Sequence, residues 1–394
     1  MDFSELHSAE LKKFVQDHLR EDPALLLLKF AGKVDFDLKT AVQQISARQK
    51  ASKKLPEWTQ NPALFFPPSL SLEQSSSEET ARHKAQGLSG NLIVDLTGGF
   101  GVDAYYLSKN FKQGIYCEYQ PELFKLTKQN LEILAPGKFQ FYQGDGLTFL
   151  KEQNQYFDLI YADPARRGKG NQKLYKIQDC EPDLVSEWEV LKEKSSQIIL
   201  KYSPMLDISQ AWNEIQDIQK ITILSVKNEV KELLIHWNKN EATPNQQVLV
   251  QDIGLGYPDF SFSLQEEKLA QTLYSEPKRF LIEPHSGILK AGAFKLFGQR
   301  LGLQKLETNS HLYTSEEYPV KIPGKVFEVI REVSPKKKEI KKLFPSGKVN
   351  VITRNYASGS EALKKKLGLK DGGDNYLIGT KTQSGFKIFW CRLA

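Results

Sequence analysis

The stretch NLIVDLTGGFGVDA, residues 91–104, decides the fold of this chain. It opens with a short apolar run that ends on Asp95 and continues into a turn that holds Gly99 and Gly101. Such a run predicts a buried strand. Glycines let the chain turn sharply and let a ligand approach the backbone without a Cβ in the way. We therefore predict a strand that ends at a ligand-binding turn.

Further strand candidates follow at intervals that leave room for helices. They are GIYCEYQ (114–120), KFQFYQGD (138–145), FDLIYADP (157–164) and SQIILKYSP (196–204), with KITILSV (220–226) and QQVLVQDI (246–253) as candidates to close the sheet. Strands that alternate with helices form a parallel sheet. The chain is therefore expected to be an α/β protein with a Rossmann-like sheet.

Acidic residues stand where several of these strands end. Glu118 lies 23 residues after Asp95, where a carboxylate accepts hydrogen bonds from both hydroxyls of a ribose. Asp145 ends the third strand and suits an adenine amino group. Asp163 ends the fourth, because Pro164 cannot donate the next ladder hydrogen bond. In open α/β sheets ligands bind at this edge.

The glycine pattern argues against a dinucleotide cofactor. A dinucleotide fold has a third glycine where a helix receives the pyrophosphate, and Ala104 follows here instead. Acids at successive strand ends suit a ligand without phosphates. S-adenosylmethionine is such a ligand, since carboxylates compensate its positive sulfonium. A nicotinamide-dependent oxidoreductase is the least favoured reading.

Residues of about 75–253 resemble the class I S-adenosylmethionine-dependent methyltransferases. Asp95 to Gly101 resembles their first motif, and Asp163-Pro164 resembles their D/N-P-P-Y motif for methylation of amino groups. Within that class, DLTGGFGVDA is similar to RNA guanine-N2 methyltransferases. The tail VITRNYASGSEALKKKLGLKDGGDNYLIGT (351–380) resembles a THUMP-like domain, and EPHSGILKAGAF (283–294) resembles the ferredoxin-like piece that precedes it.

The resemblance implies a seven-stranded methyltransferase sheet and S-adenosylmethionine as cofactor. The cofactor-binding residues that it implies or places nearby are Asp95, Thr97, Gly99, Gly101, Glu118, Tyr119, Asp145, Gly146 and Asp163. In the family, the acid of the D/N-P-P-Y motif and the carbonyl of its first proline accept hydrogen bonds from the target amine. Asp163 and Pro164 keep these two parts and are the expected catalytic residues.

The chain departs from the motif directly after Pro164. Ala165 and Arg166 replace the second proline and the stacking aromatic, which leaves the target atom open. The expected substrate-binding residues are Arg166, Arg167, Lys201 and Tyr202. Arginines hold phosphate or stack on bases, and Tyr202 or Phe100 is the candidate stacking face.

Four domains are expected. They are a helical region (1–74), the methyltransferase domain (75–253), a small ferredoxin-like α+β domain (254–324) and a basic THUMP-like domain (325–394). Within the second, Ser76 and Glu79 predict a capping box for a helix that runs through Gln86. The net charge of +6 is uneven, because residues 325–394 hold sixteen Lys and Arg against six Asp and Glu, a net +10. That concentration favours RNA as the partner.

Composition excludes several other classes. The three cysteines have no paired spacing, which favours a reducing compartment and argues against a zinc ribbon. The six histidines are scattered without metal-ligand spacing, so no metal is expected. No apolar run is long enough to span a bilayer and no signal peptide is evident, so we expect a cytoplasmic protein.

Methylation of a base amino group in rRNA or tRNA is the favoured function. A protein or small-molecule methyltransferase is the first alternative, and the basic tail argues against it. A protein that binds RNA but has lost catalysis is the second, suggested by DPAR in place of DPPY. Methylation of a pyrimidine carbon is less supported, because Cys117 lies inside a strand, Cys180 lies 17 residues past Asp163, and neither belongs to a proline-cysteine motif.

Overall fold

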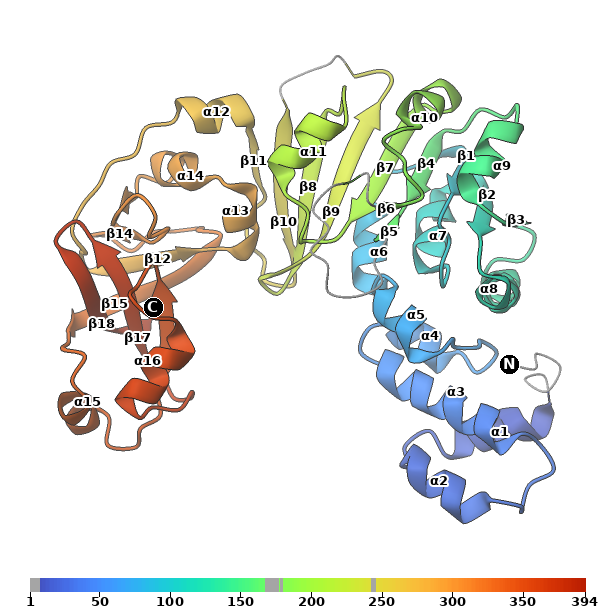
Figure 1. The fold of residues 1–394 in the computed structure, drawn as a ribbon, viewed down its shortest axis with the longest axis horizontal. Helices are drawn as coiled ribbons and strands as arrows, with labels where there is room; N and C mark the ends of the chain where they lie inside the picture. The colour runs from blue at the N-terminus through green and yellow to red at the C-terminus, as the bar shows by residue number, and fades with distance from the viewer. Residues whose placement is uncertain (1–7, 167–176, 178–179, 242–245) are drawn as a thin grey trace. The chain divides into compact units, whose positions relative to one another are not determined.

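The computed structural model describes residues 8–166, 177, 180–241 and 246–394 (Figure 1). The chain forms two compact units. The first consists of Met1–Gln219 and Leu233–Thr243, and the second of Lys220–Glu232 and Pro244–Ala394. The chain therefore leaves the first unit after Gln219 and returns to it at Leu233 before the remainder enters the second.

Short helices build the N-terminal part of the first unit (Figure 1). They are α1 (Ala9–Asp17), α2 (Pro23–Phe30), α3 (Leu38–Ala51), α4 (Pro56–Gln60), α5 (Ser69–Gln74) and α6 (Glu78–Lys84). Asp22 and Asp37 begin α2 and α3, because their carboxylates accept hydrogen bonds from backbone amides of the first turn. The predicted helical character of this region is confirmed.

Aromatic packing joins these helices to the sheet. The rings of Trp58 and Phe66 lie 5.1 and 5.6 Å from the ring of Phe100, which belongs to the glycine turn. Phe100 is only 3% exposed, so it is a core residue. Burial of three aromatic rings stabilises this contact and fixes the turn against the helical region.

The sheet of the first unit contains the strands predicted from the glycine motif onward. They are β1 (Gly90–Asp95), β2 (Phe111–Glu118), β3 (Phe139–Gln143), β4 (Leu159–Ala162) and β7 (Gln197–Tyr202), joined by β9 (Glu229–Asn238). Their order is β9-β7-β4-β1-β2-β3, and all pair in parallel except β9, which is antiparallel to β7. The helices between them are α7 (Val102–Leu107), α8 (Pro121–Leu134), α9 (Gly146–Glu152), α10 (Trp188–Lys194) and α11 (Ile208–Glu214).

This alternation of strands and helices confirms the predicted α/β class. Because neighbouring strands are parallel, the carboxyl ends of β1, β2, β3 and β4 meet at one edge of the sheet. After β4 the chain forms a small antiparallel ribbon, β5 (Ala165–Arg166) with β6 (Cys180–Glu181).

The second unit holds two groups of strands. In the first group, β8 (Lys220–Val226) pairs in parallel with β10 (Gln247–Ile253), which pairs antiparallel with β11 (Phe260–Ser263). The second group is a seven-stranded sheet in the order β13-β14-β12-β15-β18-β17-β16. Its strands are β12 (Phe280–Pro284), β13 (Gln304–Lys305), β14 (Tyr313–Ser315), β15 (Gly324–Glu332), β16 (Asn350–Arg354), β17 (Asn375–Thr382) and β18 (Gly385–Leu393). The helices are α12 (Leu264–Leu269), α13 (Ser286–Ala291), α14 (Phe294–Arg300), α15 (Lys337–Leu343) and α16 (Ser360–Leu367).

The histidine of the EPHSG stretch has a structural role within the second unit. His285 caps α13 by accepting a hydrogen bond from Gly287 N, and its Nε2 lies 2.9 Å from Asp252 Oδ2 at the end of β10. Burial lowers the pKa of His285, which favours the neutral ring. The pair therefore fastens α13 to β10.

Within the described ranges, no helix combines the length and apolar character needed to cross a bilayer.

Candidate active site

The glycine turn after β1 has a conformation that other residues adopt only with strain. Gly99 and Gly101 have φ angles of +54° and +78°, and Gly101 is the left-handed residue from which α7 starts. A Cβ on Gly101 would lie 2.6 Å from Thr127 Cγ2. A Cβ on Gly99 would meet only the Thr97 carbonyl oxygen, at 3.7 Å, so the backbone of this turn stays accessible there.

Glu118 ends β2 directly beside this turn. Its carboxylate accepts hydrogen bonds from Gly99 N at 2.9 Å and from Gln120 N at 2.7 Å. Burial raises the pKa of Glu118, and these backbone amides work against the rise. Tyr119, the next residue, is 74% exposed.

Asp145 and Gly146 follow β3 at the same edge. Asp145 caps α9 by accepting a hydrogen bond from Thr148 N at 2.7 Å. Gly146 packs so closely that a Cβ there would lie 2.1 Å from the Leu96 carbonyl oxygen. Only glycine fits at this position, because the clash is with backbone.

Asp95 and Thr97 connect the end of β1 to the loop after β4. Asp95 is 3% exposed and accepts a hydrogen bond from Thr97 N at 3.0 Å. Burial raises the pKa of Asp95 to about 8, with Asp103 and Asp163 adding to the rise. Thr97 Oγ1 in turn accepts a hydrogen bond from Asp163 N at 2.6 Å. Asp95 therefore carries little negative charge at neutral pH.

Asp163 lies at this edge with one side of its carboxylate open. The side chain is 34% exposed, and its Oδ2 is 2.6 Å from the Nζ of Lys201, near the end of β7. Burial raises the pKa of Asp163, and Lys201 works against that rise. Pro164, the second predicted catalytic residue, is buried.

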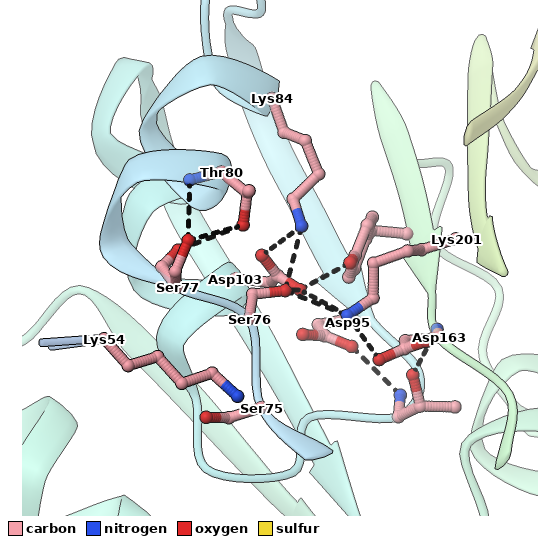
Figure 2. A network of polar contacts seen from close by, with 12 residues as sticks. Lys54, Ser75, Ser76, Ser77, Thr80, Lys84, Asp95, Asp103, Asp163 and Lys201 are labelled. Atoms are coloured by element: carbon pink, nitrogen blue, oxygen red, sulfur yellow. Dashed lines mark hydrogen bonds and ion pairs between the residues drawn. The ribbon is translucent and has the colours of Figure 1, made fainter. Parts of the chain in front are cut away.

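Lys201 belongs to a buried polar network (Figure 2). Its Nζ also lies 2.9 Å from Ser76 Oγ and 3.4 Å from Asp103 Oδ2. Asp103, on α7, accepts hydrogen bonds from Ser76 and Tyr161 and pairs with Lys84 of α6 at 2.8 Å. Burial alone would raise the pKa of Asp103, but Lys84 and Lys201 outweigh it and hold the pKa well below its usual range.

The network corrects one sequence prediction. Ser77, not Ser76, caps α6, because its Oγ accepts the hydrogen bond from Thr80 N at 3.1 Å. The helix also ends at Lys84 and does not run through Gln86. Ser76 points its hydroxyl at Asp103 instead, as Figure 2 shows. The Ser76 oxygen accepts hydrogen bonds from Lys84 and Lys201, both at 2.9 Å, so its acceptor sites are used there and not on the helix terminus.

Three other residues were predicted to bind substrate, and, within the described residues, the structure does not place any of them in the Lys201 network. They are Tyr202, Arg166 and Arg167. Tyr202 is 4% exposed, and within the described ranges its hydroxyl has no hydrogen-bond partner. Neither Tyr202 nor Phe100 presents an exposed ring in this structure. The backbone of Arg166 pairs with Cys180 in the β5–β6 ribbon, and Arg167 lies outside the described residues.

The structure thus brings most of the predicted site together and adds residues that sequence reasoning missed. The added residues are Ser76, Lys84, Asp103 and Tyr161. The sequence signal that could have indicated them is Lys201, a charged residue inside the apolar run of β7, because a lysine in a buried strand needs a buried partner. Across the described ranges, no group of three or more His, Cys, Asp or Glu side chains is arranged to hold a metal ion.

Comparisons with known proteins identify domains and relatives of this chain. Residues 280–323 match the model of a ferredoxin-like domain family, and residues 324–393 match that of a THUMP domain-like family. A crystal structure of a proposed methyltransferase from Porphyromonas gingivalis W83 is 31% identical, with a TM-score of 0.90, over 100% of this chain and 99% of that one.

Two further relatives are similar in sequence. An uncharacterised S-adenosylmethionine-dependent methyltransferase of Mycobacterium tuberculosis is 19% identical over 349 residues, which cover 87% of this chain and 93% of that protein. An uncharacterised RNA methyltransferase of Bacteroides thetaiotaomicron is 36% identical over 101 residues, which cover 24% of this chain and 22% of that protein.

The cofactor predicted from the sequence is therefore confirmed as S-adenosylmethionine. The open backbone at Gly99 and the buried acid beside it at Glu118 fit a ligand that has a ribose and no phosphate. The long match to a solved methyltransferase and the match to an S-adenosylmethionine-dependent methyltransferase of Mycobacterium tuberculosis support the same cofactor. The two C-terminal matches add the ferredoxin-like and THUMP-like domains. The chain belongs to the S-adenosylmethionine-dependent methyltransferases that carry a C-terminal THUMP-like domain.

Proposed function

We propose that the protein transfers a methyl group to a base amino group in rRNA or tRNA. The observation that carries this proposal is the position of Asp163. Its carboxylate follows β4 at the ligand edge, with Pro164 directly after it and one side open. A carboxylate and a carbonyl in succession suit an exocyclic amine, which has two N–H groups to donate.

The cofactor is proposed to lie along the glycine turn. Its candidate contacts are Asp95, Thr97, Gly99, Gly101, Glu118, Tyr119, Asp145, Gly146 and Asp163. When bound, S-adenosylmethionine supplies a methyl group on a positive sulfonium. Asp163 and the Pro164 carbonyl then accept hydrogen bonds from the amine, which fixes its plane and orients its nitrogen for attack. After methylation the nitrogen loses one proton, and the Asp163 carboxylate is within reach to accept it.

RNA as the substrate class is supported by the charge of the second unit. Exposed lysines on and around α15 and α16 make no ion pair with any other described residue, and these are Lys337, Lys338, Lys341, Lys342, Lys348, Lys365, Lys366 and Lys370. The two helices pack against each other within one cluster of buried residues. Unpaired lysines on adjacent helices suit a phosphate backbone. The Bacteroides relative that is named an RNA methyltransferase agrees with this reading.

Neutralising part of this lysine surface should weaken RNA binding in a salt-dependent way. We expect the combined change of Lys341, Lys342, Lys365 and Lys366 to alanine to lower RNA affinity at low salt. The slope of log affinity against log salt should flatten by roughly 0.7–0.9 for each RNA phosphate that the variant no longer neutralises. Fluorescence anisotropy with labelled RNA across a salt series measures both quantities.

A charge-matched control separates a local effect from a loss of net charge. Four exposed lysines of the first unit, Lys13, Lys53, Lys112 and Lys125, can be changed to alanine together. The control should keep most of the salt slope, and both variants should bind cofactor as the wild type does. Equal slopes in the two variants would show that the THUMP-like domain does not provide the RNA contacts.

The function itself is tested by the products. Mass spectrometry of nucleosides from tRNA and rRNA of a deletion strain should reveal one methylated nucleoside that is missing. The purified protein should restore it in vitro with labelled S-adenosylmethionine. Label that enters protein or a small molecule would favour the first alternative. Cofactor binding without any transfer would favour a catalytically inactive RNA-binding protein.

Arg166 and Arg167 are proposed to contact the RNA beside the target nucleotide. Only Ala165 separates them from Asp163-Pro164 in the sequence, so a substrate held by Asp163 comes close to this segment. Guanidinium groups bind phosphate or stack on bases.

A further inference from the structure

We propose that Lys201 is a positioning residue for Asp163, and that Asp103, Ser76 and Lys84 hold Lys201 in the position this requires. The proposal rests on the proposed role of Asp163 toward the target amine. It assigns to the segment around α6 a part in building the active site, although this segment carries no residue of the recognised motifs, and it gives Asp103 of the DLTGGFGVDA stretch a role beyond the glycine turn.

The contacts of Lys201 leave it little freedom. Its side chain is 7% exposed, and its ammonium lies within 3.4 Å of three oxygens, on Asp163, Ser76 and Asp103. Figure 2 shows Lys201 reaching between Asp103 and Asp163, with Ser76 beside it. An ammonium has three hydrogens to donate, and each of these oxygens can accept one of them. The lysine is therefore fixed in one orientation and cannot follow a moving substrate.

The charges of the network balance. Two lysines, Lys84 and Lys201, face two carboxylates, Asp103 and Asp163. Asp95 would unbalance them, but burial raises its pKa to about 8. Buried charges are tolerated when they are paired and hydrogen-bonded. The cluster therefore has no net charge, and Asp163 is its partly exposed member.

This arrangement orients the Asp163 carboxylate. Oδ2 is held by Lys201, and the backbone N–H of Asp163 is held by Thr97. Across the described ranges, Oδ1 receives no hydrogen bond in the structure. With one oxygen and the backbone fixed, and with the side chain 34% exposed, Oδ1 is the oxygen left to accept from a substrate amine.

Lys201 also favours the ionised form of Asp163. Burial raises the pKa of Asp163, and the groups that face it are Lys201 on β7, Lys84 on α6, Asp103 on α7 and Asp95 on β1. Lys201 is the nearest and lowers the pKa, while Asp103 raises it. Without Lys201 the pKa of Asp163 should rise further, and a protonated acid accepts the amine hydrogen bond poorly.

Lys201→Met should lower kcat roughly 10- to 100-fold, the scale of a reacting group misplaced by about 1 Å. The acid limb of the pH profile of kcat/KM should move up by about one pH unit or more. Affinity for S-adenosylmethionine should stay within about twofold of the wild type. Lys201→Arg should restore the acid limb in part, because it returns the positive charge. The exposed Lys112→Met, on the opposite end of β2, should change none of these values.

A purely structural role would lower activity without moving the acid limb, and that outcome would overturn the proposal. If Lys201→Met does not fold, Lys201→Gln keeps a donor without the charge. It should retain more turnover while still moving the acid limb. An acid limb at the wild-type position in that variant would count equally against the proposal.

A second measurement needs no RNA. The carboxyl carbon of Asp163 can be followed by NMR in protein labelled with carbon-13 aspartate, with Asp163→Asn for assignment. Its titration should move to higher pH in Lys201→Met. An unchanged titration overturns the role of Lys201 even if the RNA substrate is known. A shifted titration together with failure to methylate any RNA would leave the role of Lys201 standing and refute the proposed function instead.

Discussion

Asp163→Ala should lower kcat by roughly 10²–10³-fold, the usual scale for a hydrogen-bonding group that acts mainly in the transition state. The variant removes the acceptor that orients the amine, while cofactor contacts along the glycine turn remain. Lys201 stays within 3.4 Å of Asp103, which then faces both Lys201 and Lys84. Single-turnover methylation of the identified RNA measures the loss, and calorimetry measures cofactor affinity.

The comparison for Asp163→Ala is Asp17→Ala, an exposed aspartate at the end of α1. It should methylate at the wild-type rate. If Asp163→Ala does so as well, the segment after β4 is only a turn and the chemistry lies elsewhere. If instead cofactor affinity falls along with kcat, Asp163 acts first as a cofactor ligand.

Glu118→Ala should weaken S-adenosylmethionine binding by about 1.5–3 kcal/mol, the range for hydrogen bonds to charged groups, or roughly 10- to 150-fold in Kd. Two causes add. The proposed acceptor for the ribose hydroxyls is lost, and so is the carboxylate that receives the amides of Gly99 and Gln120. Calorimetry with S-adenosylhomocysteine measures the change.

Glu122→Ala is the matched control for Glu118→Ala. Glu122 is an exposed glutamate in the first turn of α8, and its loss should leave Kd unchanged. A 2′-deoxy analogue of the ligand separates the two causes. If Glu118 binds the ribose, the wild type should discriminate against the analogue and Glu118→Ala should not. Equal discrimination by both proteins would show that Glu118 only supports the turn.

The strands of the first unit were predictable because each is a short apolar run closed by glycine, proline or an acid. β1, β2, β3, β4 and β7 lie where their sequences predict. β9 was missed, although its segment EVKELLIHWN is apolar in its second half. β9 pairs antiparallel with β7, and such pairing depends on the neighbouring strand, so no local sequence pattern predicts it.

The sequence by itself determined the class of protein and the sheet edge at which we propose that its ligand binds. Strand ends and glycine turns are local features of a sequence, and they were enough to place four site residues at this edge, namely Gly99, Gly101, Glu118 and Asp163. Residues close in sequence determine such features, so the features can be predicted without knowledge of the rest of the chain.

Only the tertiary structure decided what surrounds Asp163. Ser76 and Lys201 are 125 positions apart in the sequence, yet they lie 2.9 Å from each other. The pattern of Ser76 and Glu79 favoured a helix cap, and the buried Asp103 carboxylate took the Ser76 hydroxyl instead. The physical reason is that burial makes an unpaired charge costly, so a distant partner outweighs a local one. Which partner that is depends on how α6, α7 and β7 pack together.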